Sequence, residues 1–139
     1  AYLTIYIPHL IKRKQRRADV RININVPVEV LYFYRNGHPV AACTMDSVDL
    51  SAGGVKIETF EKFKTGQIYQ MVIVLPLDNG NEEIYVEAEV VRSEPDPDSG
   101  LGATKYWTSF KFKDIVESKK QKILKFIYKQ QELRLKGLI

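Results

Sequence analysis

The chain has little of the chemistry that marks secreted, metal-binding or membrane-spanning proteins. Among its 139 residues there is one cysteine, Cys43, so no internal disulfide can form. The two histidines, His9 and His38, stand alone, and no group of Cys and His has the spacing of a metal site. No apolar run approaches the roughly 20 residues that a membrane-spanning helix needs. These absences favour a reducing, cytoplasmic location with neither a metal nor a membrane span.

The chain also lacks the residue groupings on which catalysis depends. It contains no Ser/His/Asp set and no glycine-rich phosphate-binding loop. Four glutamates between residues 82 and 89 resemble paired catalytic carboxylates, but their spacing is that of the solvent face of a strand. We therefore expect no enzymatic activity and no cofactor.

Length and composition are those of one soluble globular domain. Apolar residues make up 45% and charged residues 27% of the chain. Lysine and arginine total 21 against 17 acidic residues, and the resulting net charge of +4 permits an anionic partner without requiring one.

Short segments of alternating apolar and polar residues, separated by turn-forming residues, fill most of the chain. In the first, valine and isoleucine occupy every second position from Val20 to Val30. Asn36-Gly37 and residues 93–102 supply turn and loop chemistry between segments. The strands are expected at residues 20–30, 40–50, 55–58, 68–75, 84–90 and 103–112. Six short strands with one apolar face each predict an antiparallel barrel or sandwich.

The apolar period changes to that of a helix near residue 115. Asp114 and Glu117 have the spacing of a helix-opening capping box. Apolar residues then recur at helical spacing, and Gly137 follows at a position that can end the helix. These patterns predict a C-terminal helix at about residues 115–135. Its core-facing residues are expected to be Ile123, Phe126, Ile127 and Leu133.

A second apolar strip lies on the same predicted helix. Leu124, Tyr128 and Leu135 fall beside the core-facing residues and are surrounded by lysine and arginine. An apolar strip left over after core packing indicates a contact with another chain or domain. Two interpretations are open: a homodimer or partner contact through this helix, or a helix buried on a wide face.

The start of the chain has a different character. Residues 1–7 (AYLTIYI) have the composition of a strand, and a stretch dense in lysine and arginine follows them. We expect residues 1–12 to be a strand and linker left from an upstream domain, and residues 13–135 to form one domain with its barrel at about 20–113.

Two polar motifs are candidates for a binding site. The first is Arg17-Ala18-Asp19-Val20-Arg21, in which Arg21 faces away from the core because Val20 and Ile22 face into it. The second is Asp49-Leu50-Ser51-Ala52-Gly53-Gly54, in which Asp49 and Ser51 share one face and the glycines allow close backbone approach. A cluster of arginines needs an anionic partner to offset its own repulsion.

Together these motifs resemble the PilZ domain, a family that binds cyclic diguanylate. The family pattern is Arg-x-x-x-Arg followed by Asp/Asn-x-Ser-x-x-Gly, and the chain matches both parts in order. The resemblance extends over about residues 12–130 and implies a six-stranded antiparallel β-barrel followed by a C-terminal helix. The opening IPHLIKRKQRR is also similar to the linker of flagellar-brake-type members, in which another barrel precedes the PilZ domain.

The resemblance implies a non-enzymatic receptor for cyclic diguanylate that controls motility or biofilm formation. Ligand would order the N-terminal linker and so reorient an attached domain or protein partner. The implied ligand-binding residues are Arg16, Arg17, Arg21, Asp49, Ser51 and Gly54. An alternative is a PilZ-like protein-interaction scaffold that binds no nucleotide. A third interpretation is a small basic barrel that binds RNA. Such a surface requires basic and aromatic residues that alternate along a strand face, and this chain does not have that pattern. We therefore expect neither DNA nor RNA as a partner.

Three further positions carry expectations. Cys43 lies in the middle of a predicted strand, which predicts a small core residue. Trp107, in the last strand, is expected to pack in the core rather than stack on ligand. Ser109 stands where many family members have glycine, three residues before Phe112, and its side chain is expected to narrow the pocket.

Overall fold

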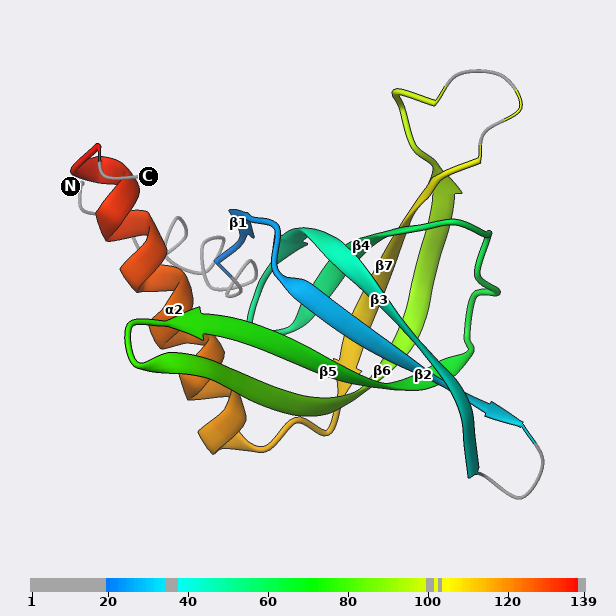
Figure 1. Cartoon of the computed structure of the whole chain (residues 1–139), viewed down its shortest axis with the longest axis horizontal. Helices are drawn as coiled ribbons and strands as arrows, with labels where there is room; N and C mark the ends of the chain where they lie inside the picture. Colours follow the sequence, from blue (N-terminus) through cyan, green and yellow to red (C-terminus); the bar gives the residue numbers. More distant parts are fainter. Residues whose placement is uncertain (1–19, 35–37, 100–101, 103, 138–139) are drawn as a thin grey trace, which may run out of the picture.

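The protein is a closed antiparallel β-barrel with one additional short strand and a C-terminal helix, as the sequence predicts (Figure 1). The computed structural model describes residues 20–34, 38–99, 102 and 104–137. The expected remnant at residues 1–12 and the predicted ligand-binding residues Arg16 and Arg17 lie outside the described residues. The elements are β1 (Ile22–Asn23), β2 (Pro27–Tyr34), β3 (His38–Leu50), β4 (Gly54–Thr59), β5 (Ile68–Leu77), β6 (Gly80–Pro95), β7 (Tyr106–Lys113) and α2 (Glu117–Leu135).

Six of the strands close the barrel. The sheet runs β3-β2-β5-β6-β7-β4, and β4 pairs again with β3, so that each of the six has two neighbours. All of these pairings are antiparallel. Closure leaves no free edge around the barrel. The two-residue strand β1 is the extra element and pairs with the end of β3, Ile22 opposite Leu50 and Asn23 opposite Asp49.

The first predicted strand is interrupted, and Ser47 shows why. Residues 24–26 leave the strand geometry between β1 and β2. The hydroxyl of buried Ser47 accepts a hydrogen bond from the backbone N–H of Val26 at 2.8 Å and donates one to the carbonyl oxygen of Ile24. These bonds satisfy the backbone where the strand bends, and they place β1 against the end of β3.

Alternation along the strands fills the barrel interior with aliphatic and aromatic side chains. The core includes Val26, Val28, Val30, Leu50, Ile57, Met71, Ile73, Leu75, Ile84, Val90, Phe110 and Phe112. The expectation that Cys43 is a core residue is wrong, because its side chain is exposed. Its cross-strand partner in β2, Val30, is buried, but the pairing of β3 with β4 runs only from Ser47 to Leu50, so Cys43 lies on the part of β3 before that pairing. Alternation therefore assigns a face correctly but does not show how far along β3 a second strand covers it.

The loop expected at residues 93–102 is partly a strand. β6 continues to Pro95 and pairs with β7 through Ser93–Thr108, Glu94–Trp107 and Pro95–Tyr106. Pro95 is the last residue of this strand.

The capping box predicted at Asp114 does not form. The backbone of Asp114 is left-handed, with φ of 48°, whereas an N-cap residue needs an extended backbone. Val116 is the N-cap residue instead, with φ of −70° and ψ of 150°, and it makes no side-chain capping bond. The helix begins at Glu117. The turn out of β7 thus uses Asp114 for its sharp bend rather than for capping.

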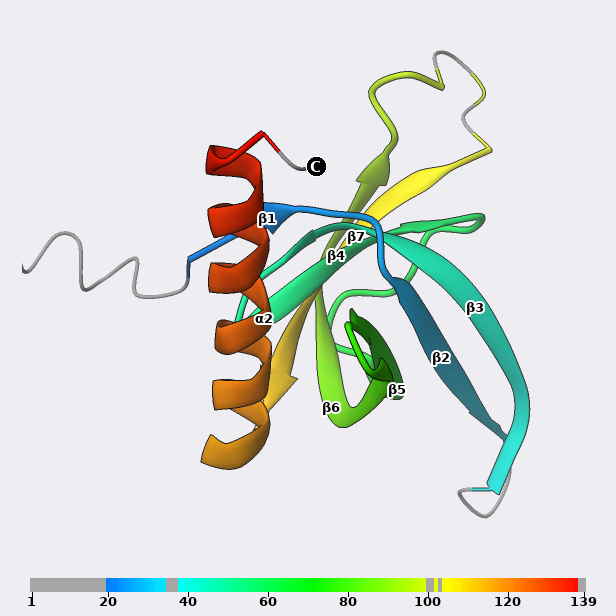
Figure 2. The same cartoon turned by 60° about the vertical axis from the view of Figure 1, so that its left-hand side comes forward.

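Helix α2 lies along one side of the barrel, beside the β5–β6 hairpin and β1 (Figures 1 and 2). Its buried residues are Ile123, Phe126 and Ile127, three of the four predicted. Lys119 Nζ donates to the carbonyl oxygen of Tyr85 at 2.6 Å, and Arg134 in the last turn donates to the carbonyl oxygen of Asn23 in β1. Among the described residues, no helix is both long and apolar enough to cross a membrane.

The second apolar strip of α2 is partly open to solvent. Tyr128 is 53% and Leu135 is 89% exposed, whereas Leu124 is half-buried. A dimer contact through this strip stays a prediction.

Candidate functional site

A row of polar side chains crosses the outer face of the barrel. Cross-strand pairing places Asp49 of β3 opposite Lys56 of β4, and Lys56 opposite Ser109 of β7. Ser109 in turn lies opposite Arg92 of β6. Directly paired residues in antiparallel strands point to the same face, so residues from four strands meet on one surface.

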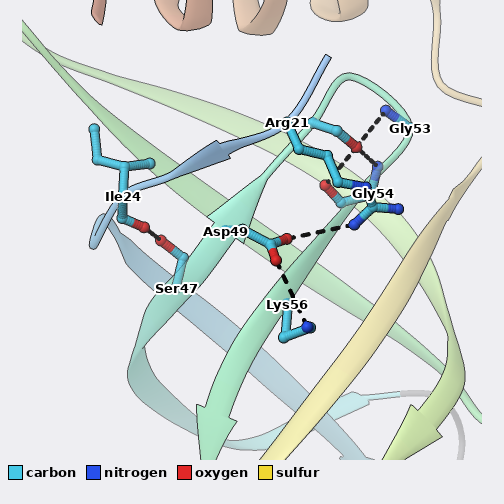
Figure 3. A network of polar contacts seen from close by, with 8 residues as sticks. Arg21, Ile24, Ser47, Asp49, Gly53, Gly54 and Lys56 are labelled. Atoms are coloured by element: carbon cyan, nitrogen blue, oxygen red, sulfur yellow. Dashed lines mark hydrogen bonds and ion pairs between the residues drawn. The ribbon is translucent and has the colours of Figure 1, made fainter. Parts of the chain in front are cut away.

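Asp49 is the centre of the charge pattern in this row. Its side chain is 11% exposed and lies between two cations, with Oδ1 at 3.5 Å from Nη1 of Arg21 and Oδ2 at 3.7 Å from Nζ of Lys56 (Figure 3). Both distances are at the long end for ion pairs. The carboxylate is therefore held in place without being saturated by short hydrogen bonds, and it can still accept from a ligand.

Arg21 points away from the core, as strand parity predicts. Its side chain is 65% exposed, and it enters the site from the position just before β1, which the bonds of Ser47 hold against β3. An exposed guanidinium beside a carboxylate that it contacts only at 3.5 Å keeps most of its donors available.

Ser51 shapes the turn between β3 and β4. Its hydroxyl is buried and accepts from the backbone N–H of Gly53 at 3.2 Å and of Gly54 at 3.1 Å, and it donates to the carbonyl oxygen of Gly54 at 3.2 Å. A backbone bond from Ser51 to the same carbonyl, at 2.9 Å, closes the turn. The hydroxyl that the sequence assigns to a ligand is thus engaged within the turn.

Gly54 allows β4 and β7 to approach. A Cβ atom at this position would stand 2.2 Å from the carbonyl oxygen of Phe110, far closer than van der Waals contact permits. Among the described glycines, those with positive φ are Gly66, Gly80, Gly102 and Gly137. Gly54 is required here for lack of space rather than for an unusual backbone angle.

A cavity of about 500 Å³ opens beside this turn. Its lining includes four basic side chains, from Arg21, Lys56, Arg92 and Lys111. The described part of its lining contains no carboxylate, and Asp49 lies next to it through its contacts with Arg21 and Lys56. A concave surface with this charge favours an anionic ligand.

Lys56 and Trp107 also lie on this surface, and neither was predicted as a site residue. Lys56 was missed, although Val55 and Ile57 flank it as core residues and its parity sets it on the outer face. Trp107 was expected in the core and is instead half-buried on the outer face, with Lys56 Nζ 5.1 Å from its ring centroid. Thr108 and Phe110 are buried, and because side chains alternate along a strand, Trp107 must point to the opposite, outer face. This alternation is the sequence signal for its position.

Comparisons with known proteins give one family and one fold. The family model described as the PilZ domain matches residues 15–129. The structure of Bacillus subtilis inhibitor of motility (MotI/DgrA) is similar with a TM-score of 0.70 at 25% identity, covering 84% of this chain and 52% of that one. The PilZ domain of YcgR from Escherichia coli, solved with c-di-GMP, is similar with a TM-score of 0.64 at 16% identity, covering 88% and 98%. The K. pneumonia MrkH–c-di-GMP complex gives a TM-score of 0.60 at 20% identity, covering 88% and 55%. The chain spans about half the length of MotI, and no curated protein matches it significantly.

Proposed function

The chain belongs to the PilZ domain family, and from this premise we propose that it is a cytoplasmic, non-enzymatic receptor for cyclic diguanylate. The observation that carries the proposal is Asp49 held between Arg21 and Lys56, two of the four basic residues that line the cavity. Two structural relatives, YcgR and MrkH, were solved with cyclic diguanylate, the c-di-GMP named above.

The chemistry of the ligand matches these groups. Cyclic diguanylate carries two phosphates and two guanine bases. The planar fork of arginine pairs with phosphate oxygens or with O6 and N7 of guanine, and its face stacks on a base. A carboxylate accepts from N1–H and the exocyclic amine of guanine, and adenine does not present that pair of donors. We assign Arg21 to the first role and Asp49 to the second.

The remaining predicted residues take different parts in the proposal. Arg16 and Arg17, outside the described residues, would add cations from the segment that leads into β1. Ser51 and Gly54 would act by setting the backbone of the turn that borders the cavity, since their own contacts lie within the barrel.

Calorimetric titration with cyclic diguanylate, and with cyclic diadenylate in parallel, tests the proposal. We expect saturable binding of the guanine compound and much weaker binding of the adenine compound. No heat from either would remove the receptor role and leave the protein-interaction scaffold. Equal binding of both would mean that phosphate alone is recognised.

Asp49→Ala should reduce both affinity and base selectivity. Hydrogen bonds to a charged group contribute about 1.5–3 kcal/mol, so the affinity for cyclic diguanylate should fall by roughly ten- to a hundredfold. Binding of cyclic diadenylate should be unchanged or slightly tighter, because a negative charge beside Arg21 and Lys56 has been removed. Asp98→Ala, in an exposed loop, is the control with the same change in charge. A parent-like selectivity in Asp49→Ala would separate Asp49 from base recognition.

Ligand binding is proposed to order the segment 10–21 across the cavity. The segment contributes its basic side chains to the ligand and reorients an upstream domain or protein partner, with motility or biofilm formation as the output. MotI, similar in structure, is named as an inhibitor of motility. A second copy of this chain, docked on the exposed strip of α2, is the other partner we propose.

Hydrogen exchange should detect this ordering. With cyclic diguanylate, amides of residues 10–17 should exchange much more slowly than without it, because contacts with ligand remove them from solvent. Amides at the turn of the β5–β6 hairpin, residues 77–80, serve as the internal control because none of these residues lines the cavity. Equal protection of residues 10–17 before and after ligand addition would exclude linker ordering as the relay.

A further inference from the structure

The cavity wall formed by β6 and β7, here called the far wall because it lies away from Asp49, contains a β-bulge that the two motifs do not explain. Val90 pairs with Phe110, but the next pair along the strands is Arg92 with Ser109, so Val91 is inserted in β6 without a partner in β7. In a regular strand, Val91 and Arg92 would point to opposite faces. Here both are exposed, Val91 at 52%, and both line the cavity. Bulges of this kind redirect side chains and are frequent at functional sites.

The bulge lies at the opposite end of the cross-strand row from Asp49. Asp49 and Arg92 stand at the two ends of the cross-strand row, with Lys56 and Ser109 between them. Neighbouring strands lie about 4.8 Å apart, so three spacings separate the two backbones by roughly 14 Å. Both Arg21 and Arg92 nevertheless line the same cavity. A ligand that fills it meets the two walls with different parts of its structure.

The far wall is electropositive and weakly paired. Arg92 Nε is 3.5 Å from Glu94 Oε1, and both side chains are about 60% exposed (62% and 59%). An exposed pair at this distance contributes little and is easily exchanged for a better acceptor. Lys111 lies opposite Glu89, but Glu89 makes its ion pair with Nζ of Lys113 at 3.3 Å. Arg92 and Lys111 are thus available to an incoming anion.

We propose that Val91, Arg92 and Lys111 form a second subsite, which holds the half of the cyclic dinucleotide that Arg21 and Asp49 do not reach. Arg92 and Lys111 contact the second phosphate, and the exposed Val91 side chain packs against the face of the second guanine. The subsite rests on the proposed function, since it assumes a ligand with two phosphates and two bases. It makes the β6–β7 wall a determinant of affinity for the intact cyclic dinucleotide.

Neutral substitutions on the far wall test the subsite. Arg92→Gln and Lys111→Gln should each weaken cyclic diguanylate about tenfold in a calorimetric titration, and the double variant should weaken it further. Affinity should also depend less steeply on salt in the double variant, because fewer charged contacts remain to be screened. Both residues are exposed, so thermal unfolding should match the parent.

Lys64→Gln is the control, since it removes the same charge from an exposed position in the loop between β4 and β5. Suppose that the parent protein binds cyclic diguanylate and that Arg92→Gln, Lys111→Gln and the double variant all bind it as tightly as Lys64→Gln does. This result would overturn the subsite and leave the receptor role intact. Parent protein that does not bind cyclic diguanylate would overturn the receptor role, and the subsite with it.

Discussion

Arg21→Ala is expected to weaken cyclic diguanylate binding by roughly ten- to a hundredfold without changing the stability of the barrel. Loss of charge-assisted hydrogen bonds to a phosphate or a guanine edge costs about 1.5–3 kcal/mol of binding free energy. The side chain is 65% exposed, and its described partner is Asp49 at 3.5 Å, so little packing is lost with it. Asp49 keeps its contact with Lys56 at 3.7 Å.

Calorimetry measures the affinity and urea unfolding measures the stability of the same Arg21→Ala preparation. Lys64→Ala, which removes an exposed cation that does not line the cavity, should bind as the parent does. If Arg21→Ala folds normally and binds as tightly as the parent, Arg21 has no part in the site.

Gly54→Ala is expected to destabilise the fold by about 3 kcal/mol, a large share of the 5–15 kcal/mol typical of a domain. The added Cβ would stand 2.2 Å from the carbonyl oxygen of Phe110, and a backbone atom cannot rotate away as a side chain can. Either β4 or β7 must shift, which disturbs the pairing from Gly54–Lys111 to Thr59–Tyr106.

Urea unfolding should show a lower midpoint for Gly54→Ala with an unchanged slope. Gly137→Ala is the control because no atom lies within 4 Å of its added Cβ, and it has only the cost of a left-handed residue, about 1 kcal/mol. A Gly54→Ala protein as stable as Gly137→Ala would mean that the two strands separate at little cost. The ligand affinity of Gly54→Ala should fall as well, since the same strands form the cavity wall.

Much of the site could be predicted because its residues lie on strands with clear alternation. The apolar neighbours of Arg21 and of Asp49 place both side chains on the outer face, and the structure brings them to 3.5 Å of each other. The same argument was available for Lys56 and was not applied to it. Ser51 and Gly54 were selected by their motif, but the sequence does not show that one holds a turn and the other admits a neighbouring strand.

The errors have physical causes outside local sequence. Cys43 alternates correctly with its neighbours and pairs with buried Val30, yet it lies before the segment Ser47–Leu50 through which β3 pairs with β4. Asp114 has the spacing of a cap, but the turn from β7 into α2 needs a left-handed residue there. The predicted loop after residue 93 is drawn into β6 by pairing with β7. For this loop, pairing with a distant segment prevailed over the local turn preference.

The sequence by itself determined where most of the strands lie, which faces of them are apolar, and which motifs identify the family. These properties follow from the two-residue period of an extended backbone and from the chemistry of arginine, aspartate and glycine, which act over a few residues. The tertiary structure decided how the strands register, that β4 closes on β3, and that a bulge at Val91 turns Arg92 toward the same cavity as Arg21. Register and bulges depend on pairing and packing energies between segments far apart in the chain. The charge pattern of the cavity is therefore a product of the closed barrel, although each charge in it can be found in the sequence.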